Sequence, residues 1–172
     1  MSPPWSKPLE IDRLADSQAD LDFAVPLAEL TRLRSQHSSI AGTVQGHAHF
    51  AREAGFPVVE LHMSGTAHLT CQRCLQEMLE PVTSAARIAL IGTEADAARV
   101  PEHLEPMLAA GGQISIGELV EEEMLLSLPI VPLHAAASEC QVGSGSHSAA
   151  DPEPQHTTQR PFEQLRDLLK RS

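Results

Sequence analysis

The sequence contains very few aromatic residues: four Phe, one Trp and no Tyr, which together make up 3% of its 172 residues. Proteins that bind RNA on the surface of a β-sheet stack several bases on aromatic rings, so the shortage of rings argues against this mode of binding. The hydrophobic content is an ordinary 42%. A core must therefore be built from Leu, Val, Ile, Ala and Met.

Basic residues are also scarce, because 12 Lys and Arg stand against 23 Asp and Glu, giving a net charge of −11. Affinity for nucleic acid comes largely from neutralising phosphates, so the chain as a whole is a poor binder of naked RNA. Contact with RNA would be local or would pass through a protein. The acidic balance suits either solubility alone or docking onto a basic protein.

Long apolar stretches and a basic leader are missing as well. The chain has no run of eighteen apolar residues, and residues 1–5 (MSPPW) carry no positive charge. We therefore expect neither a transmembrane helix nor a signal peptide. The lack of these two segments and the odd number of cysteines, three, favour a protein of the reducing cytoplasm whose thiols are free or bound to a metal.

Period-two alternation is the clearest pattern in the chain. Apolar or small residues recur at every second position in residues 40–50, 59–71 and 82–90, and residues 21–25 read as a further short strand. Short connections between consecutive strands favour an antiparallel meander. Gly65, inside the second of the long strands, suggests a β-bulge. Residues 92–112 are rich in Gly and Pro and are expected to form a loop.

Two helices are expected beside the sheet. One would span residues 27–35, after Pro26. The other would begin at Ser115, which fits a capping box with Glu118, and would end before Pro129. We interpret the glutamates of residues 121–123 as a solvated helix face rather than as a catalytic or metal site. The packed face of this helix would comprise Leu119, Val120, Met124, Leu125 and Leu128.

These patterns predict an α+β fold, an antiparallel β-meander with one or two packed helices and a flexible C-terminal tail. We expect an extended N-terminal segment at residues 1–20 and a single β-rich domain at residues 21–142. A disordered linker rich in Ser, Gly, Pro and His would follow at residues 143–160. Residues 161–172 would form a short amphipathic helix, either docked onto the domain or folding on a partner.

Metal-binding chemistry is the main candidate for a functional site. Cys71 and Cys74 form a C-x-x-C turn, and His134 and Cys140 could complete a Cys₃His set that binds zinc. Alternatively, Cys71 packs in the core while Cys74 and Cys140 are free thiols. A redox C-x-x-C is less well supported because the motif follows a strand of a meander, and nothing provides an oxyanion hole for a Cys–His nucleophile.

Four histidines fall on the polar faces of the predicted strands, and the sequence places no acid or cysteine at ligand spacing beside them. We therefore expect a solvated sheet surface rather than a catalytic or metal site. They are His47, His49, His62 and His68.

The two motifs together resemble the bacterial YceD family, the large ribosomal RNA subunit accumulation proteins. Residues 70–75 (TCQRCL), residues 121–134 (EEEMLLSLPIVPLH), Cys140 and residues 160–171 (RPFEQLRDLLKR) carry the resemblance, which spans roughly residues 40–172. It implies a cytoplasmic ribosome-biogenesis factor that supports synthesis, processing or stability of large-subunit (23S) ribosomal RNA. It implies no enzymatic activity. The partner would be a ribosomal protein or a large-subunit assembly particle, with no membrane involved.

Two other functions remain open at this point. One is an RNA-processing hydrolase that uses His134 or the glutamates of residues 121–123. The other is a protein-interaction module that is held together by zinc and has no link to the ribosome.

Overall fold

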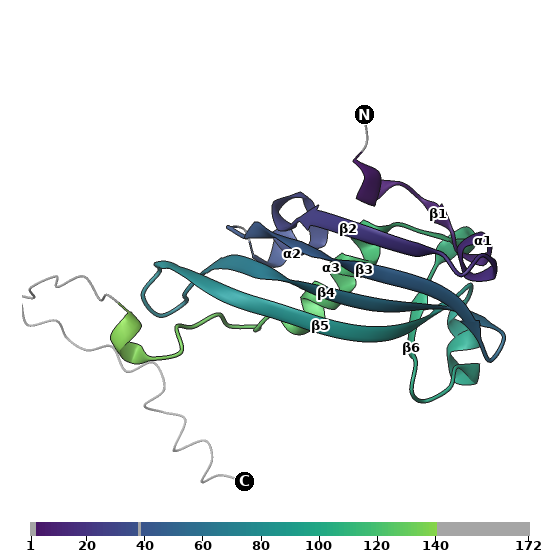
Figure 1. Ribbon diagram of the computed structural model, residues 1–172. Coiled ribbons are helices and arrows are strands. Elements are labelled where there is room, and N and C mark those ends of the chain that lie inside the picture. Colours follow the sequence, from purple (N-terminus) through teal and green to yellow (C-terminus); the bar gives the residue numbers. More distant parts are fainter. Residues whose placement is uncertain (1–2, 38, 141–172) are drawn as a thin grey trace, which may run out of the picture. The chain divides into compact units, whose positions relative to one another are not determined.

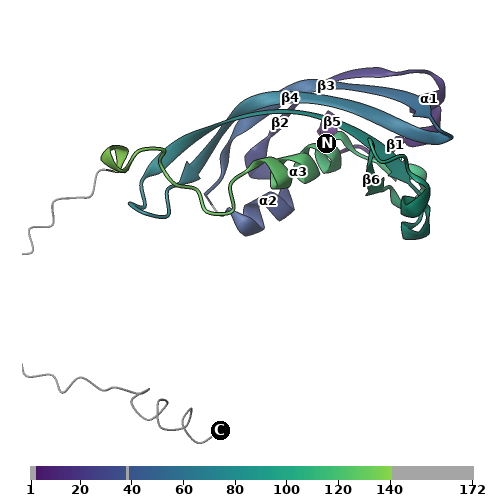
Figure 2. The same ribbon diagram turned by 90° about the horizontal axis from the view of Figure 1, so that it is seen from below.

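Five strands form a curved sheet that carries two helices on its concave face (Figures 1 and 2). The computed structural model describes residues 3–37 and 39–140. The strands, in their order across the sheet, are β2 (Asp20–Pro26), β3 (Ala41–Glu53), β4 (Phe56–Thr70), β5 (Glu77–Ile91) and β6 (Glu105–Leu108). The first four pair in antiparallel fashion, so the predicted α+β fold with an antiparallel meander is confirmed.

The alternation read from the sequence matches the buried face of the sheet. Val44, Ala48 and Phe50 of β3 are fully buried, and the residues between them are at least partly exposed. Leu61 of β4 is likewise fully buried between the partly exposed Glu60 and the exposed His62. A two-residue turn at Ala54 and Gly55, both with positive φ, joins these strands. Such a turn matches the natural twist of a hairpin and fixes the register of every later residue of β4.

Gly65 does not mark the predicted bulge. Strand β4 pairs with β3 and with β5 without interruption on either side of this residue. A Cβ atom at Gly65 would lie 2.5 Å from the Thr43 carbonyl oxygen and 3.0 Å from the Val44 Cα. The glycine is therefore needed because two strands approach closely, which is the other common reason for glycine in a strand.

The expectation of an extended segment at residues 1–20 is wrong. This region contains a 3₁₀ turn η1 (Pro4–Ser6), a short strand β1 (Leu9–Glu10) and helix α1 (Ile11–Asp16). Strand β1 pairs with β7 (Gln113–Ile114). The helix forms because Ile11 and Ala15, four residues apart, are both buried against the sheet.

The helix predicted at residues 27–35 is broken. A 3₁₀ turn η2 (Leu27–Glu29) and helix α2 (Thr31–Gln36) are separated by Leu30, whose backbone is extended. Leu27, Leu30 and Leu33 are all buried. In an uninterrupted α-helix, positions three residues apart drift around the axis, so the break at Leu30 lets all three side chains face the core.

The stretch at residues 92–112 is not only a loop. It contains the 3₁₀ segments η3 (Glu94–Arg99) and η4 (Ala110–Gly112) as well as β6, which pairs in parallel with β5. Leu104 covers Val58 and Ala89 in a small satellite core. This packing explains why a four-residue segment, too short to show a period, joins the sheet.

Helix α3 (Ile116–Ser127) begins and ends as predicted. Glu118 and Ser115 form the capping box, and the helix ends two residues before Pro129. The η5 turn (Ala137–Glu139) follows in the segment after the helix. The described residues belong to one compact unit, whereas the predicted linker at 143–160 and the predicted C-terminal helix at 161–172 lie outside them. None of the helices described is both long and apolar enough to span a bilayer.

We expect Gly65→Ala to lower the free energy of unfolding by about 2 kcal/mol or more, because the new methyl group must push two paired strands apart. Gly92→Ala is the matched control, since a Cβ atom there meets nothing within 4 Å, and its effect should be about 0.5 kcal/mol or less. Urea denaturation followed by circular dichroism measures both. Equal effects would contradict the close approach at Gly65.

Candidate metal centre

Four potential metal ligands meet at the end of the sheet where β4 leads into β5. The ligand atoms of Cys71, Cys74, His134 and Cys140 all lie within 4.8 Å of one another. The Cys71 and Cys140 sulfurs are 3.9 Å apart, and His134 Nδ1 lies 3.4 Å from the Cys74 sulfur and 3.6 Å from that of Cys140. The four residues predicted from the sequence are therefore brought together.

The alternation of β4 places the first ligand. Cys71 continues the buried face on which Leu69 lies, so its side chain points toward the side of the sheet that carries the helices. A tight turn follows: the Leu75 N–H donates to the Cys71 carbonyl, and the Cys71 N–H donates to the Gln76 carbonyl. This turn brings Cys74 back beside Cys71.

The second pair of ligands comes from the segment after α3. Here the Gln72 N–H donates to the Pro132 carbonyl at 2.9 Å, and the His134 N–H donates to the Cys71 sulfur at 3.4 Å. These bonds hold the segment against the C-x-x-C turn. The η5 turn then brings Cys140 to the same point, where it is 6% exposed.

Three of the six distances between the four donors match the edges of a tetrahedral zinc site. With Zn–S bonds of about 2.3 Å and a Zn–N bond of about 2.0–2.1 Å, a tetrahedron has S···S edges of about 3.8 Å and S···N edges of about 3.6 Å. The observed 3.9 Å between the sulfurs of Cys71 and Cys140, and the 3.4 and 3.6 Å to His134, agree with these edges. Three thiols and one imidazole also form a donor set that binds zinc in preference to harder cations.

The electrostatics of the cluster favour one thiolate and oppose a second. Burial acts against ionisation of Cys71, but N–H groups of His134, Cys74 and Arg73 point at its sulfur and lower its pKa to about 5. Burial raises the pKa of Cys140, and the sulfurs of Cys74 and Cys71 beside it raise it further. A bound dication removes this conflict because it stabilises several thiolates at once.

Arg73 places a positive charge beside the cluster, and the sequence motifs did not predict this. Its Nη1 atom lies 3.8 Å from the Cys140 sulfur, although the residue itself is exposed. A zinc ion with three thiolates and a neutral imidazole carries a net charge of −1, which a nearby guanidinium offsets. The only signal in the sequence was the position of this arginine between the two cysteines of the C-x-x-C turn.

A family model described as "Large ribosomal RNA subunit accumulation protein YceD" matches residues 59–169. The chain belongs to the YceD family. The matched range contains all four candidate ligands. A curated relative from Haemophilus influenzae, named "Large ribosomal RNA subunit accumulation protein YceD", is 28% identical over 144 residues that cover 80% of each chain. No solved structure matches the chain.

The glutamates of this YceD-family protein do not form the solvated face that was predicted. Glu121 and Glu123 are only 9% and 8% exposed. Glu121 Oε1 accepts the backbone N–H groups of Arg32 at 2.7 Å and of Leu33 at 3.1 Å. It therefore caps the first turn of α2, where the preceding Leu30 offers no side-chain acceptor.

Glu123 ties the same helix to the sheet. Its carboxylate accepts hydrogen bonds from the hydroxyl groups of Ser84 on β5 and Ser127 on α3. Glu122, between the two buried glutamates, pairs with Arg32 at the surface. The buried carboxylates thus hold α3 against α2 and β5, and both have hydrogen-bond partners within the fold.

The histidines on the outer sheet face have acidic neighbours that the sequence did not reveal. His47 contacts Asp22 at 3.0 Å and Asp20 at 2.9 Å, and His49 contacts Asp20 at 2.8 Å. The hydrogen bonds to Asp22 and Asp20 raise the pKa of His47. The side chains of His47, His49 and His68 remain 35–43% exposed, as expected for a solvated surface.

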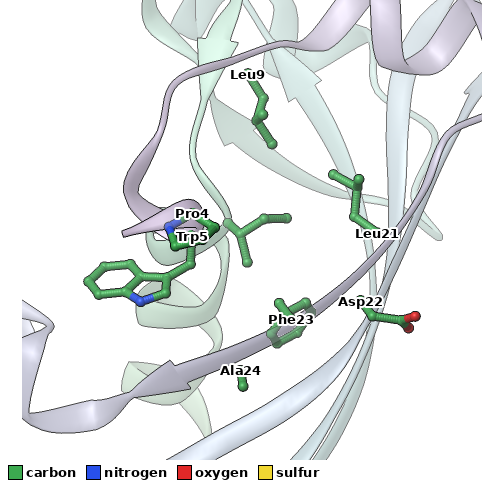
Figure 3. A pocket seen from close by; sticks show the side chains of 8 residues that line it. Pro4, Trp5, Leu9, Leu21, Asp22, Phe23 and Ala24 are labelled. Carbon is green, nitrogen blue, oxygen red and sulfur yellow. The ribbon is translucent and has the colours of Figure 1, made fainter. Parts of the chain in front are cut away.

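An apolar pocket of about 350 Å³ lies between η1, β1 and β2 (Figure 3). Trp5 lies on one side of it and Leu21 and Phe23 on the other. Asp22 is the charged residue of the lining, and its carboxylate points away from the apolar side chains. This lining offers neither a nucleophile nor an acid–base pair, so the metal centre is the stronger candidate site.

We expect Glu121→Ala to lower the free energy of unfolding by about 1–3 kcal/mol, because two backbone N–H groups lose their buried acceptor. Glu122→Ala is the control: its ion pair with Arg32 joins side chains that are 41% and 59% exposed, and such pairs contribute about 1 kcal/mol at most. Urea titration of both variants measures the two changes in the free energy of unfolding. If Glu122→Ala were the more damaging change, the capping role of Glu121 would be refuted.

Proposed function

We propose that the protein is a non-enzymatic, cytoplasmic factor needed for large-subunit ribosomal RNA to accumulate, and that it acts by binding a ribosomal protein or an assembly particle. Membership of the YceD family carries this proposal, because the family description and the curated relative are both named for this process. The net charge of −11 supports a basic protein as the direct contact rather than naked RNA.

We further propose that Cys71, Cys74, His134 and Cys140 bind one zinc ion. Four protein donors would fill all tetrahedral positions and leave none for a water molecule, which is the arrangement of structural rather than catalytic zinc sites. The ion would join the C-x-x-C turn after β4 to the segment after α3, two regions about 60 residues apart in sequence.

The site argues against the hydrolase alternative. His134 would be occupied as a zinc ligand, and the carboxylates of Glu121 and Glu123 are used as buried hydrogen-bond acceptors. A general acid or base must reach the substrate. Of the groups that the alternative names, Glu122 alone keeps an exposed carboxylate, and it pairs with Arg32 at the surface.

Protein purified under reducing conditions is expected to contain one equivalent of zinc, measured by inductively coupled plasma mass spectrometry. Removal of the metal with a chelator should lower the Tm by about 5–10 °C, because binding and folding are coupled. Cys74→Ser should reduce the zinc content, whereas His62→Ala, on the exposed outer face, should not. Less than about 0.2 equivalents in the wild type would refute the zinc site.

Depletion of the protein in cells is expected to lower the ratio of large-subunit to small-subunit ribosomal RNA, with immature ends on the remaining large-subunit species. The ratio is measured on total RNA, and the ends by primer extension. Expression of the wild-type chain should restore the ratio, and Cys74→Ser should restore it less well. An unchanged ratio after depletion would contradict the proposed role.

A further inference from the structure

Large apolar side chains are exposed around the metal centre. Those of Leu75, Leu79, Ile130, Val131 and Leu133 are 70%, 60%, 96%, 56% and 40% exposed. We call these five residues the knuckle surface. Scattered exposed apolar residues are normal, but these five come from the two segments that meet at one site, and two of them line the same pocket, which is typical of an interaction surface.

The knuckle surface comes from the same two segments that provide the candidate zinc ligands. Leu75 and Leu79 follow Cys74, and residues 130–133 directly precede His134. The hydrogen bond from the Gln72 N–H to the Pro132 carbonyl holds the two segments together. Figures 1 and 2 show this end of the sheet, the β4–β5 connection, extending beyond α3 and away from β6.

A pocket of about 470 Å³ opens in this surface, between residues 77–81 of β5 and residues 133–139. Leu79 and Leu133 both line it, so an exposed apolar residue of each segment borders the same space. A pocket of this size accommodates one or two side chains of a bound segment. It offers a place for an apolar anchor of the kind that dominates binding at protein interfaces.

Leu75 adds an independent observation. Its φ is +59°, in the left-handed region that favours glycine or asparagine, and yet it is a leucine that is 70% exposed. Neither local backbone preference nor burial in this chain accounts for a large apolar side chain here. Strained residues of this kind cluster at functional sites.

The charges at the pocket indicate what kind of partner fits. Glu77, Glu80 and Glu139 line it, and none of its described lining residues is Lys or Arg. The Glu77 carboxylate contacts His68, and that of Glu139 accepts the Ala136 N–H at 3.4 Å. Arg73, in the neighbouring turn, directs its guanidinium toward Cys140. Phosphates would be repelled here, whereas lysine and arginine would be attracted.

We propose that the knuckle surface binds a lysine- and arginine-rich segment of a partner protein, which inserts an apolar side chain between Leu79 and Leu133. This inference rests on the proposed function, since it specifies the chemistry of the ribosomal or assembly partner. The glutamates at the pocket attract the basic side chains, and the apolar residues bury the anchor. The metal centre holds the two halves of the surface in place.

The test uses the full-length chain with the photo-crosslinking residue p-benzoylphenylalanine in place of Leu79, incubated with purified large-subunit precursor particles. After irradiation, mass spectrometry identifies the crosslinked peptide. The expected product is a basic segment of a protein that contains apolar residues. The same residue in place of Leu126 is the matched control, because Leu126 is 72% exposed but faces a different pocket, between α3 and β6.

Several outcomes would overturn the inference. These are a crosslink to RNA, a crosslink to residues 160–172 of the same chain, and a yield at position 79 no higher than at position 126. A crosslink to an acidic or uncharged protein segment would also overturn it. Each result names a different occupant of the surface or shows that nothing binds there.

A second measurement compares affinities. Leu79→Ser combined with Leu133→Ser should reduce recovery with precursor particles about tenfold, because two anchors are removed. Leu126→Ser should leave recovery unchanged. Glu77→Gln combined with Glu80→Gln should reduce recovery most at low salt, since the attraction is screened by ions. Equal Tm and zinc content among these variants show that the fold is intact.

The same experiment separates this inference from the proposed function. If the wild-type chain does not sediment with large-subunit precursors, both the proposed function and the partner inferred here are refuted. If the wild type sediments and the Leu79→Ser, Leu133→Ser variant sediments equally well, the proposed function stands and only the knuckle surface is refuted.

Discussion

Contacts among three cysteines and one histidine join two distant segments at one end of this molecule. Cys71 and Cys140 bring their sulfurs to 3.9 Å, and Cys74 adds a third within 4.8 Å. The N–H groups directed at Cys71 stabilise one negative charge there, but burial and the neighbouring sulfurs oppose ionisation of Cys140. A bound dication would resolve this conflict, because it stabilises several thiolates at once. The described part of the segment after α3 contains no strand, so its attachment to the sheet depends on these contacts.

Within α3 itself the attachment is of a different kind. Glu121 caps α2 and Glu123 binds Ser84 of β5, so buried carboxylates join three elements without any metal. Burying a charge is unfavourable unless hydrogen bonds satisfy it, and here each carboxylate has at least two donors. One helix is thus fixed by acids in its middle, and the chain that follows it is fixed by sulfur and nitrogen donors.

The sequence predicted the parts of this structure that depend on local periodicity. Strands β3, β4 and β5 followed from residues that alternate over ten or more positions, and the start of α3 followed from Ser115 and Glu118. The grouping of the four candidate ligands was predicted from residue type and spacing, because few combinations of Cys and His suit a tetrahedral ion. What the sequence did not reveal depends on contacts between distant segments. Glu121 reads as solvated because its acceptor role exists only once α2, some 90 residues earlier, lies beside it.

The same reasoning explains the other differences. Strand β6 has four residues, too few to show a period, and joins the sheet through its pairing with β5. The break at Leu30 is imposed by burial of three leucines and not by a helix-breaking residue at that position. A glycine within a strand, such as Gly65, is compatible with a bulge or with close approach of a neighbouring strand. The position of β3 shows that close approach is the reason here. Tertiary packing, rather than local propensity, selected the outcome in each case.

The exposed leucines of the knuckle surface are most readily understood together with the charge of the chain. An apolar surface of this kind promotes self-association, and a net charge of −11 opposes it by repulsion between copies. The same charge would attract the basic partner that we propose, so one property would both oppose self-association and favour this partner. Because the candidate ligands come from the same segments as the knuckle surface, a bound metal would help to hold Leu79 and Leu133 in place relative to each other. Metal occupancy and partner binding are therefore expected to be thermodynamically coupled, with each strengthening the other.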